Sequence, residues 1–321
     1  MSNPRRHHYC PESFLAWFTT GLTRDGTLWV FDRTKHQIRK SIPKNEGHQR
    51  DFYRVDVNDG SDPFFLEKQF SDIEGGAKHA IDFILKEKRL PDVKSMEFLL
   101  SFAGLLAVRT PSYRKKMAGV YEELAKKVME VACADEKMFE ATKNRLIDEG
   151  HDLAELTYED TKEFVEKDDY TVGTPQNQHL VTMLKSAATI TECLYQRNWI
   201  IAVAVGGEYI CSDNPIGLDW SKKPTTWRSP GFGLSGTEVT IPISKGIALI
   251  GIFETPPYTT ATLDRAGVAN LNNKSIQRAE RYIYGSNDDF IWRNEKGDVV
   301  NAKEYFFTHG HLLPAAEYPK K

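Results

Sequence analysis

The feature that most constrains this chain is a helix that is apolar almost all round, in the segment "PDVKSMEFLLSFAGLLAVRTP". A helix without a polar face has to be covered on every side. Its apolar run, residues 96–108, is about thirteen residues long, whereas a membrane span needs roughly 20. Protein rather than lipid therefore has to cover it. Because the N-terminus also has no apolar leader segment, we expect a soluble, cytoplasmic protein with no membrane partner.

The segments before this core helix predict two more helices and a small β unit. A first helix begins at Pro11, whose φ angle is already helical. "GTLWVFDRTKHQIRKSIPKN" then predicts two strands around a polar turn. From Asp62, an aspartate cap followed by proline predicts a long helix with apolar residues at helical spacing, and its adjacent Gly75 and Gly76 favour a kink.

Beyond the core helix the period of the apolar pattern changes. Residues 113–169 predict a long, highly charged helical stretch that breaks near Gly150, and a further helix begins near Pro175. "NWIIAVAVGGEYICSDNP" then predicts a β-hairpin with a Gly-Gly turn, and "TEVTIPISKGIALIGIF" a second pair of strands. "GVANLNNKSIQRAERYIYG" predicts a closing helix.

This order of elements indicates the fold class. Mixed helix and strand, then helices, then strands and a helix are typical of an α+β fold and not of an alternating parallel sheet. We expect an N-terminal helix with a small β-hairpin, a helical middle, and C-terminal antiparallel strands with a closing helix. No repeat and no Pro/Gly/Ser-rich linker divides the sequence, so residues 1–321 are expected to form a single compact domain.

Two carboxylates on the helix from Asp62 require partners. Glu67 and Glu74 are seven residues apart, which is two helical turns, so both lie on the apolar face. A carboxylate on an apolar face needs a partner, and Arg109 is the charge at the C-terminal end of the core helix. We expect an Arg109–Glu74 ion pair, either purely structural or one that orients catalytic groups.

A polar cluster precedes the first helix, in "RRHHYCPESFLAWF". His7 and His8 are adjacent, so in an extended segment their side chains point in opposite directions and cannot serve one site equally. A pKa near neutrality makes histidine the natural general acid or base, and Tyr9 can donate to developing charge. The alternative is a hydrogen-bonded surface cluster without chemistry.

A third polar segment, "CSDNP", closes the first late strand. Ser, Asp and Asn before a proline are the residues of an Asx turn, which is a purely structural explanation. The functional explanation is that the end of the strand delivers Asp213 and Asn214 into a cleft.

Charge and missing fingerprints narrow the classes of function. The net charge is −3, yet residues 1–50 carry nine Lys or Arg against four Asp or Glu. The basic N-terminal third is therefore a candidate surface for nucleic acid, the alternative being an ordinary solvated face. The fingerprints of P-loop NTPases, Rossmann enzymes, α/β-hydrolases and zincins are absent, and the four cysteines are too far apart for a zinc ribbon or a disulfide framework.

Eight segments together resemble one protein family, the domain of unknown function 4238 (DUF4238). They include "RHHYCPESFLAWF", "GTLWVFDRTK", "EKQFSDIE", "VRTP" and "ICSDNP", and the resemblance covers roughly residues 5–285. Two departures are Cys10, where the family usually has valine, and "LAWF", where it usually has Leu-Arg-Asn-Phe. The resemblance implies marked positions but no activity: His7, His8, Tyr9, Pro11, Asp32, Tyr53, Glu67, Glu74, Arg109, Ser212, Asp213, Asn214 and Pro215.

The first functional hypothesis is a nuclease that cleaves RNA or DNA, with a bacterial defence or toxin role as its context. One histidine acts as general base or metal ligand, Glu67, Glu74 and Asp213 hold Mg²⁺ or Mn²⁺ or orient the histidine, and Arg109 neutralises phosphate charge. Without a metal, the histidine cleaves RNA with stabilisation by arginine or tyrosine. The candidate catalytic set is His7, His8, Tyr9, Glu67, Glu74, Arg109, Asp213 and Asn214.

Two alternatives stay open. A nucleotide-cofactor transferase, similar to ADP-ribosylating enzymes, would use His8, Tyr53 and Glu67 or Glu74 to hold its cofactor. A sensor or binding module without turnover would use the cluster as a buried polar network that fixes the fold. The sequence leaves the oligomeric state undetermined.

Overall fold

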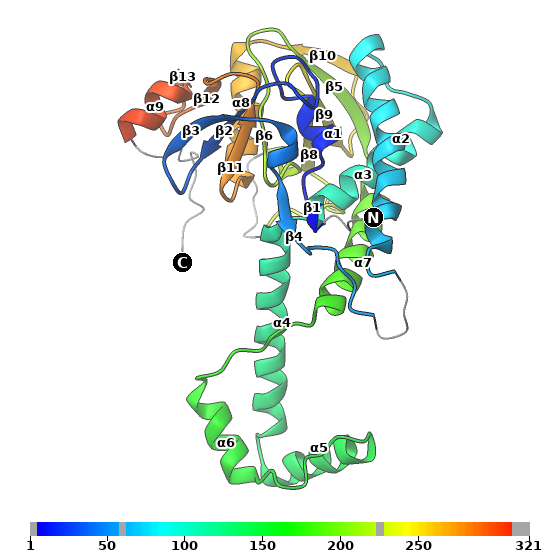
Figure 1. Cartoon of the computed structure of the whole chain (residues 1–321), viewed down its shortest axis with the longest axis vertical. Helices are drawn as coiled ribbons and strands as arrows, with labels where there is room; N and C mark the ends of the chain where they lie inside the picture. Colours follow the sequence, from blue (N-terminus) through cyan, green and yellow to red (C-terminus); the bar gives the residue numbers. More distant parts are fainter. Residues whose placement is uncertain (1–4, 58–61, 223–227, 310–321) are drawn as a thin grey trace. The chain divides into compact units, whose positions relative to one another are not determined.

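The computed structural model (Figure 1) describes residues 5–57, 62–222 and 228–309. The chain divides into two compact units. Unit 1 takes in the described residues of 1–112 and 180–321, and unit 2 comprises residues 113–179. The single compact domain expected from the sequence stays a prediction.

Two sheets and two short ribbons make up the β structure of unit 1. One sheet has the order β3-β2-β11-β6, with all neighbours antiparallel: β2 (Leu28–Asp32), β3 (Gln37–Ser41), β6 (Cys211–Ser212) and β11 (Tyr282–Gly285). The other has the order β10-β5-β9-β8-β7: β5 (Asn198–Ala204), β7 (Gly217–Trp220), β8 (Thr237–Ser244), β9 (Ile247–Ile252) and β10 (Thr260–Leu263). Only the β10–β5 pair of this sheet is parallel. The antiparallel ribbons are β1 (Arg6–His8) with β4 (His48–Arg50), and β12 (Ile291–Arg293) with β13 (Val299–Asn301).

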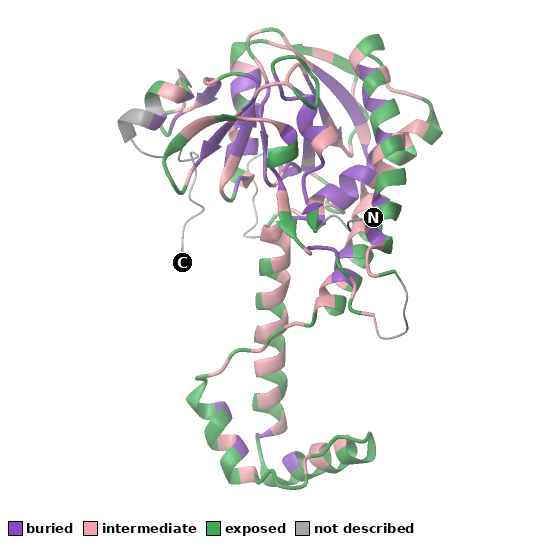
Figure 2. Ribbon diagram, in the orientation of Figure 1, coloured by how far each residue is buried: buried purple, intermediate pink, exposed green. Residues whose placement is uncertain are grey.

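Helices cover these strands. Those that lie within unit 1 are α1 (Glu12–Ala16), the short 3-10 helix η1 (Pro43–Asn45), α2 (Phe65–Glu87), α3 (Val93–Val108), α8 (Arg265–Arg278) and α9 (Ala302–His309). Figure 2 shows buried residues along the central strands and along α3. The predicted α+β class is confirmed, with an N-terminal helix and hairpin, a helical middle and late antiparallel strands.

Helix α3 is the predicted core helix. Asp92 caps it by accepting a hydrogen bond from the backbone N–H of Ser95 (2.9 Å). Its neighbour α2 begins at Phe65, two residues later than predicted, because Asp62 accepts the N–H of Phe64 and so holds the entry turn outside the helix. Gly76 lies where a Cβ would come within 2.3 Å of the Phe98 ring. The glycine therefore lets α2 and α3 approach each other, and α2 continues through it.

The predicted hairpin with a Gly-Gly turn is wrong. β5 pairs with β9 and β10, whereas β6 pairs with β11 in the other sheet. A two-residue hairpin turn needs a positive φ, and neither Gly206 nor Gly207 has one. A Cβ on Gly206 would lie 2.0 Å from the backbone nitrogen of Arg265. The pair therefore carries the chain from one sheet to the other, close against the start of α8.

The predicted closing helix extends too far. α8 ends at Arg278, and Tyr282–Gly285 form β11, the strand that pairs with β2. Backbone N–H groups of Arg281 and Tyr282 donate to the Asp213 carboxylate in this connection. These bonds hold the chain extended, so a local pattern that suits a helix gives way to long-range pairing.

Unit 2 is a small helical unit. It contains most of α4 (Pro111–Ala132), α5 (Glu136–Asp148), α6 (Tyr158–Lys167) and the start of α7 (Gln176–Tyr195). The chain breaks at Asp135 as well as near Gly150, since Asp135 and Thr157 each cap a new helix. Nowhere in the described residues does a helix have both the length and the apolar composition to cross a membrane.

Candidate functional site

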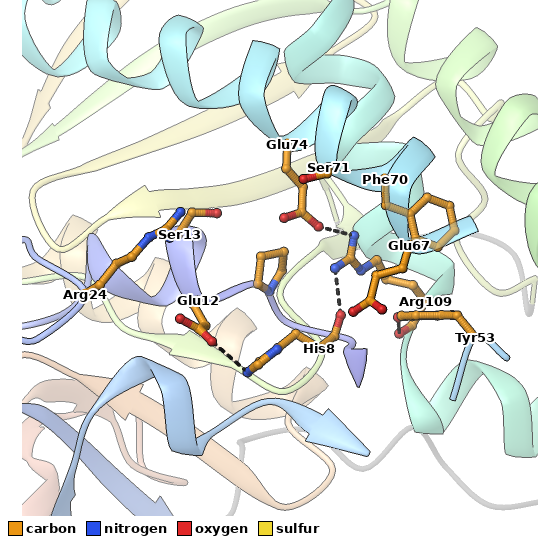
Figure 3. A pocket seen from close by; sticks show the side chains of 11 residues that line it. His8, Glu12, Ser13, Arg24, Tyr53, Glu67, Phe70, Ser71, Glu74 and Arg109 are labelled. Carbon is orange, nitrogen blue, oxygen red and sulfur yellow. Dashed lines mark hydrogen bonds and ion pairs between the residues drawn. The ribbon is translucent and has the colours of Figure 1, made fainter. Parts of the chain in front are cut away.

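A polar cavity in unit 1 collects many of the residues that the sequence marked. Its volume is about 260 Å³, just below the range of about 300–1,000 Å³ of ligand pockets, so a phosphate or one part of a nucleotide is the size of group it suits. Figure 3 shows the α2 side chains and the N-terminal segment facing each other across it. It is lined by His8, Pro11, Glu12, Ser13, Arg24, Tyr53, Glu67, Phe70, Ser71, Glu74 and Arg109.

Strand alternation gives the two histidines different surroundings. β1 pairs antiparallel with β4, with His7 opposite Gln49 and His8 opposite His48. Successive side chains of a strand point to opposite faces. His7 is completely buried, whereas His8 is half-buried and lines the cavity. Only His8 is therefore placed to meet a bound molecule there.

His7 is a positioning residue. Its Nδ1 accepts a hydrogen bond from the backbone N–H of Tyr53 (2.7 Å). A neutral imidazole with an accepting Nδ1 carries its proton on Nε2, and this Nε2 lies 3.6 Å from Oε2 of Glu67. The Tyr53 ring stacks on the imidazole, with centroids 5.8 Å apart. His7 therefore holds the backbone at Tyr53 and lies below the cavity surface, close to the Glu67 carboxylate.

His8, unlike His7, lines the cavity and is available as a base. Its Nε2 lies 3.4 Å from the carbonyl oxygen of Lys44 and 3.6 Å from Oε1 of Glu12. Both neighbours accept protons, so they favour the tautomer with the proton on Nε2 and the lone pair on Nδ1. Burial lowers the pKa of His8, against the opposing charge of Glu12. His8 is therefore a neutral base at pH 7, oriented by a carboxylate.

Glu67 is a carboxyl group that holds its proton more tightly than usual. Burial raises its pKa, the charge of Glu74 raises it further, and Arg109 acts in the opposite direction. Its side chain keeps 32 % of its surface exposed, so the group remains accessible from the cavity. A carboxyl with a raised pKa in the same cavity as a neutral histidine, here Glu67 and His8, is a typical acid–base pair.

Arg109 holds the walls of the cavity together. Its side chain is 2 % exposed, and Nη1 lies 2.9 Å from Oε1 of Glu74, which confirms the ion pair expected from the sequence. Nη2 donates to the carbonyl oxygen of His8 (2.7 Å) and Nε to that of Tyr9 (3.1 Å). In turn the Tyr53 hydroxyl donates to the carbonyl oxygen of Arg109 (3.1 Å). These contacts occupy the guanidinium with the protein's own groups.

The late polar segment and Tyr9 lie outside the cavity lining. Tyr9 is buried and interacts with Tyr284, near Asp213. Asp213 accepts hydrogen bonds from the backbone N–H groups of Glu280, Arg281 and Tyr282, at 2.8 to 2.9 Å. Asn214 belongs to the turn itself, where its carbonyl oxygen accepts from the Ser212 hydroxyl (2.9 Å). The structure thus brings together His8, Glu67, Glu74 and Arg109 but not Asp213 and Asn214.

Replacing Asp213 with asparagine is expected to destabilise the protein by about 1–3 kcal/mol, the cost of leaving buried N–H groups without an acceptor. The asparagine amide turns one accepting oxygen into a donor that faces those N–H groups. Urea unfolding measures the loss. Asp92→Asn is the matched control, because asparagine caps a helix as well as aspartate does and Asp92 is exposed. Equal midpoints for the two variants would contradict the expectation.

Three cavity residues carried no signal in the sequence. Arg24 lies in the loop before β2, exposed at the edge of the cavity, with no ion pair to any described residue. Ser13 and Ser71 give no sign in the sequence that they line a cavity. Glu12 was missed although it had a local signal, since it lies four residues after His8 in the first turn of α1.

A metal was expected at Glu67, Glu74 and Asp213. Over the residues that the structure describes, no three His, Cys, Asp or Glu side chains form a group that could hold a metal ion. Glu74 pairs with Arg109, and Asp213 accepts three backbone N–H groups elsewhere. The Mg²⁺ or Mn²⁺ ion stays a prediction, with Glu67 and Glu74 as the members of that set that line the cavity.

Comparison with known proteins identifies the family to which this sequence is matched. Residues 6–289 match the family described as "Protein of unknown function (DUF4238)". No curated protein and no solved structure matches the chain. The match spans the elements that build the cavity, from β1 to α3, and also the late strands.

Proposed function

We propose, from the premise that the chain belongs to the DUF4238 family, that its cavity cleaves phosphodiester bonds of RNA by general acid–base catalysis. The observation that supports this most is the pairing, in one cavity, of an oriented neutral histidine with a carboxyl group of raised pKa. RNA carries its own nucleophile, the 2′-hydroxyl, so the reaction needs a base and an acid.

The proposed roles follow from the positions of the protons. Nδ1 of His8 takes the proton of the 2′-hydroxyl as that oxygen forms a bond to phosphorus. Glu67 gives its proton to the 5′-oxygen as the bond from phosphorus to that oxygen breaks. Glu12 stabilises the imidazolium that forms on His8, and Arg24 neutralises the phosphate charge. After the reaction His8 is protonated and Glu67 is ionised. Proton exchange with water returns both groups to their starting states.

The charges of the cavity lining are compatible with a bound phosphate, because its carboxylates do not all remain negative. Glu74 is neutralised by Arg109 at 2.9 Å. A protonated Glu67 leaves Glu12 as the remaining negative group in the lining, which also contains Arg24, an arginine with no ion pair to a described residue. A phosphate can therefore enter when Glu67 holds its proton, and that is the form in which Glu67 acts as an acid.

The transferase alternative has weaker support. His8, Tyr53 and Glu67 all line the cavity, as that hypothesis requires. However, Tyr53 is 1 % exposed and its hydroxyl donates to the carbonyl oxygen of Arg109. That hydroxyl is committed to the fold, so it is poorly placed to hold a cofactor.

The test is cleavage of labelled RNA and of the same sequence as DNA, by purified protein with Mg²⁺, with Mn²⁺ and with EDTA. Cleavage of RNA alone, undiminished by EDTA, is the expected result. Cleavage of both substrates that EDTA abolishes would replace this mechanism with a metal-dependent nuclease that uses Glu67. Absence of any cleavage by folded protein would overturn the proposal and favour the transferase or the sensor, which binding of NAD would distinguish.

The rate should pass through a maximum as pH changes, because the proposed base and acid need opposite protonation states. His8 acts as a base only when neutral, and its pKa lies below the ordinary 6.5; Glu67 acts as an acid only when protonated, and its pKa lies above the ordinary 4.5. The rate therefore falls as pH drops through the first pKa and as pH rises through the second. Glu67→Gln should lower the rate and remove the alkaline limb of the profile. A wild-type rate that stays constant through this region would contradict the assignment.

A further inference from the structure

We infer that one face of the β1–β4 ribbon binds the phosphate backbone of a single-stranded nucleic acid and leads it to His8. The inference rests on the proposed function only for the direction in which the strand runs. Binding itself follows from the charges and the register of the ribbon.

The register places four nitrogen-bearing side chains on one face. Arg6 lies opposite Arg50, and His8 lies opposite His48. Residues directly opposite in an antiparallel pair share a face, and so do residues two apart along a strand. The face is therefore a ladder of two rungs, an arginine rung and a histidine rung. His7 points to the other face, into the protein.

The arginine rung is unfavourable for folding alone. Like charges directly opposite each other in a sheet destabilise it, yet Arg6 and Arg50 are both exposed on this short ribbon. One carboxylate, that of Asp51, lies 3.4 Å from Nε of Arg50. Arg6 makes no ion pair within the described residues. A ligand with several negative charges would remove the repulsion.

The histidine rung connects this face to the cavity. The rings of His8 and His48 meet edge to face, with centroids 5.4 Å apart, and His8 is part of the cavity lining. Two residues along a strand rise by about 6.8 Å. A backbone whose phosphates contact the arginine rung therefore brings its next segment to the base of the proposed reaction.

Binding to such a face depends on salt. Each phosphate that an arginine neutralises releases counterions, and the slope of log K against log salt concentration changes by about 0.7 for each contact with a single strand. Removing both arginines of the rung removes two contacts. The slope should therefore become shallower by about 1.4.

The experiment is fluorescence anisotropy with a labelled single-stranded DNA over a series of salt concentrations. DNA lacks the 2′-hydroxyl and so is not cut by the proposed reaction. The variant is Arg6→Gln with Arg50→Gln, and the matched control is Arg89→Gln with Arg265→Gln, which removes the same charge from other exposed positions of unit 1. We expect weaker binding and a slope shallower by about 1.4 in the first variant, with no change in slope in the control.

The outcomes separate the two proposals. An unchanged slope in the ribbon variant, or an equal change in the control, overturns the binding face even where RNA cleavage is observed. Normal salt-dependent binding without any cleavage overturns the proposed reaction and leaves the binding face standing. Far-ultraviolet circular dichroism shows whether each variant keeps its fold.

Discussion

Replacing Arg109 with alanine is expected to lower the free energy of unfolding by about 3–5 kcal/mol, the cost of breaking a buried ion pair by removing one partner. The change leaves the carboxylate of Glu74 without its cation and the carbonyl oxygens of His8 and Tyr9 without their donor. It also removes a cation that lies over the rings of Tyr53 and Phe70, 5.7 and 5.6 Å from their centroids. Urea unfolding followed by tryptophan fluorescence measures the loss.

The control is an exposed ion pair on the same helix as Glu74. Lys78 pairs with Asp82 at 2.5 Å, but both side chains are almost half exposed. Lys78→Ala should therefore change the free energy of unfolding by no more than about 0.5 kcal/mol. If Arg109→Ala unfolds at the same urea concentration as this control, Arg109 does not hold the walls of the cavity together.

Replacing His8 with alanine is expected to reduce the rate of RNA cleavage by about 10²–10⁴-fold, the usual contribution of a positioned general base. The fold should survive, because the side chain is half-buried and makes no close hydrogen bond, its nearest acceptor being 3.4 Å away. Initial rates and a thermal melt of the same preparation give both quantities. The matched control is His79→Ala, an exposed histidine of α2, which should change neither.

The variant Glu12→Gln tests whether Glu12 acts on His8 or only stabilises the fold. The carboxylate of Glu12 raises the pKa of His8 against the effect of burial. Without that charge, the pKa of His8 drops further, so the acid limb of the rate profile moves to lower pH. The loss of rate should be smaller than for His8→Ala. A severe loss of stability in this variant and in both His8→Ala and Arg109→Ala would instead favour the sensor hypothesis.

The parts of the fold that follow local pattern were predictable. The core helix has no polar face, and the structure buries it as α3. The Arg109–Glu74 pair followed from the same reasoning, because carboxylates on an apolar helix face need a partner and Arg109 is the charge at the end of the core helix. The family membership, too, followed from the order and spacing of motifs along the chain.

The parts that depend on distant segments were not predictable. A Gly-Gly pair between two apolar runs favours a hairpin locally, but Gly206 serves the close approach of Arg265, which is far away in sequence. Asp213 shows the same limit, since its three donors lie in residues 280–282. An Asx turn and a catalytic aspartate have the same local sequence. Only the distant partners separate them.

The order in which the chain is synthesised gives the position of Tyr9 a biological consequence. Tyr9 follows the cavity residue His8 in the sequence. It interacts with Tyr284, near Asp213. Domains fold as units while the N-terminal part leaves the ribosome first. The segment made first is therefore fixed by segments made last. The residues that line the cavity all lie between His8 and Arg109, so a nascent chain can bring them together early, whereas Tyr9 reaches its packed position only after Tyr284 has been made.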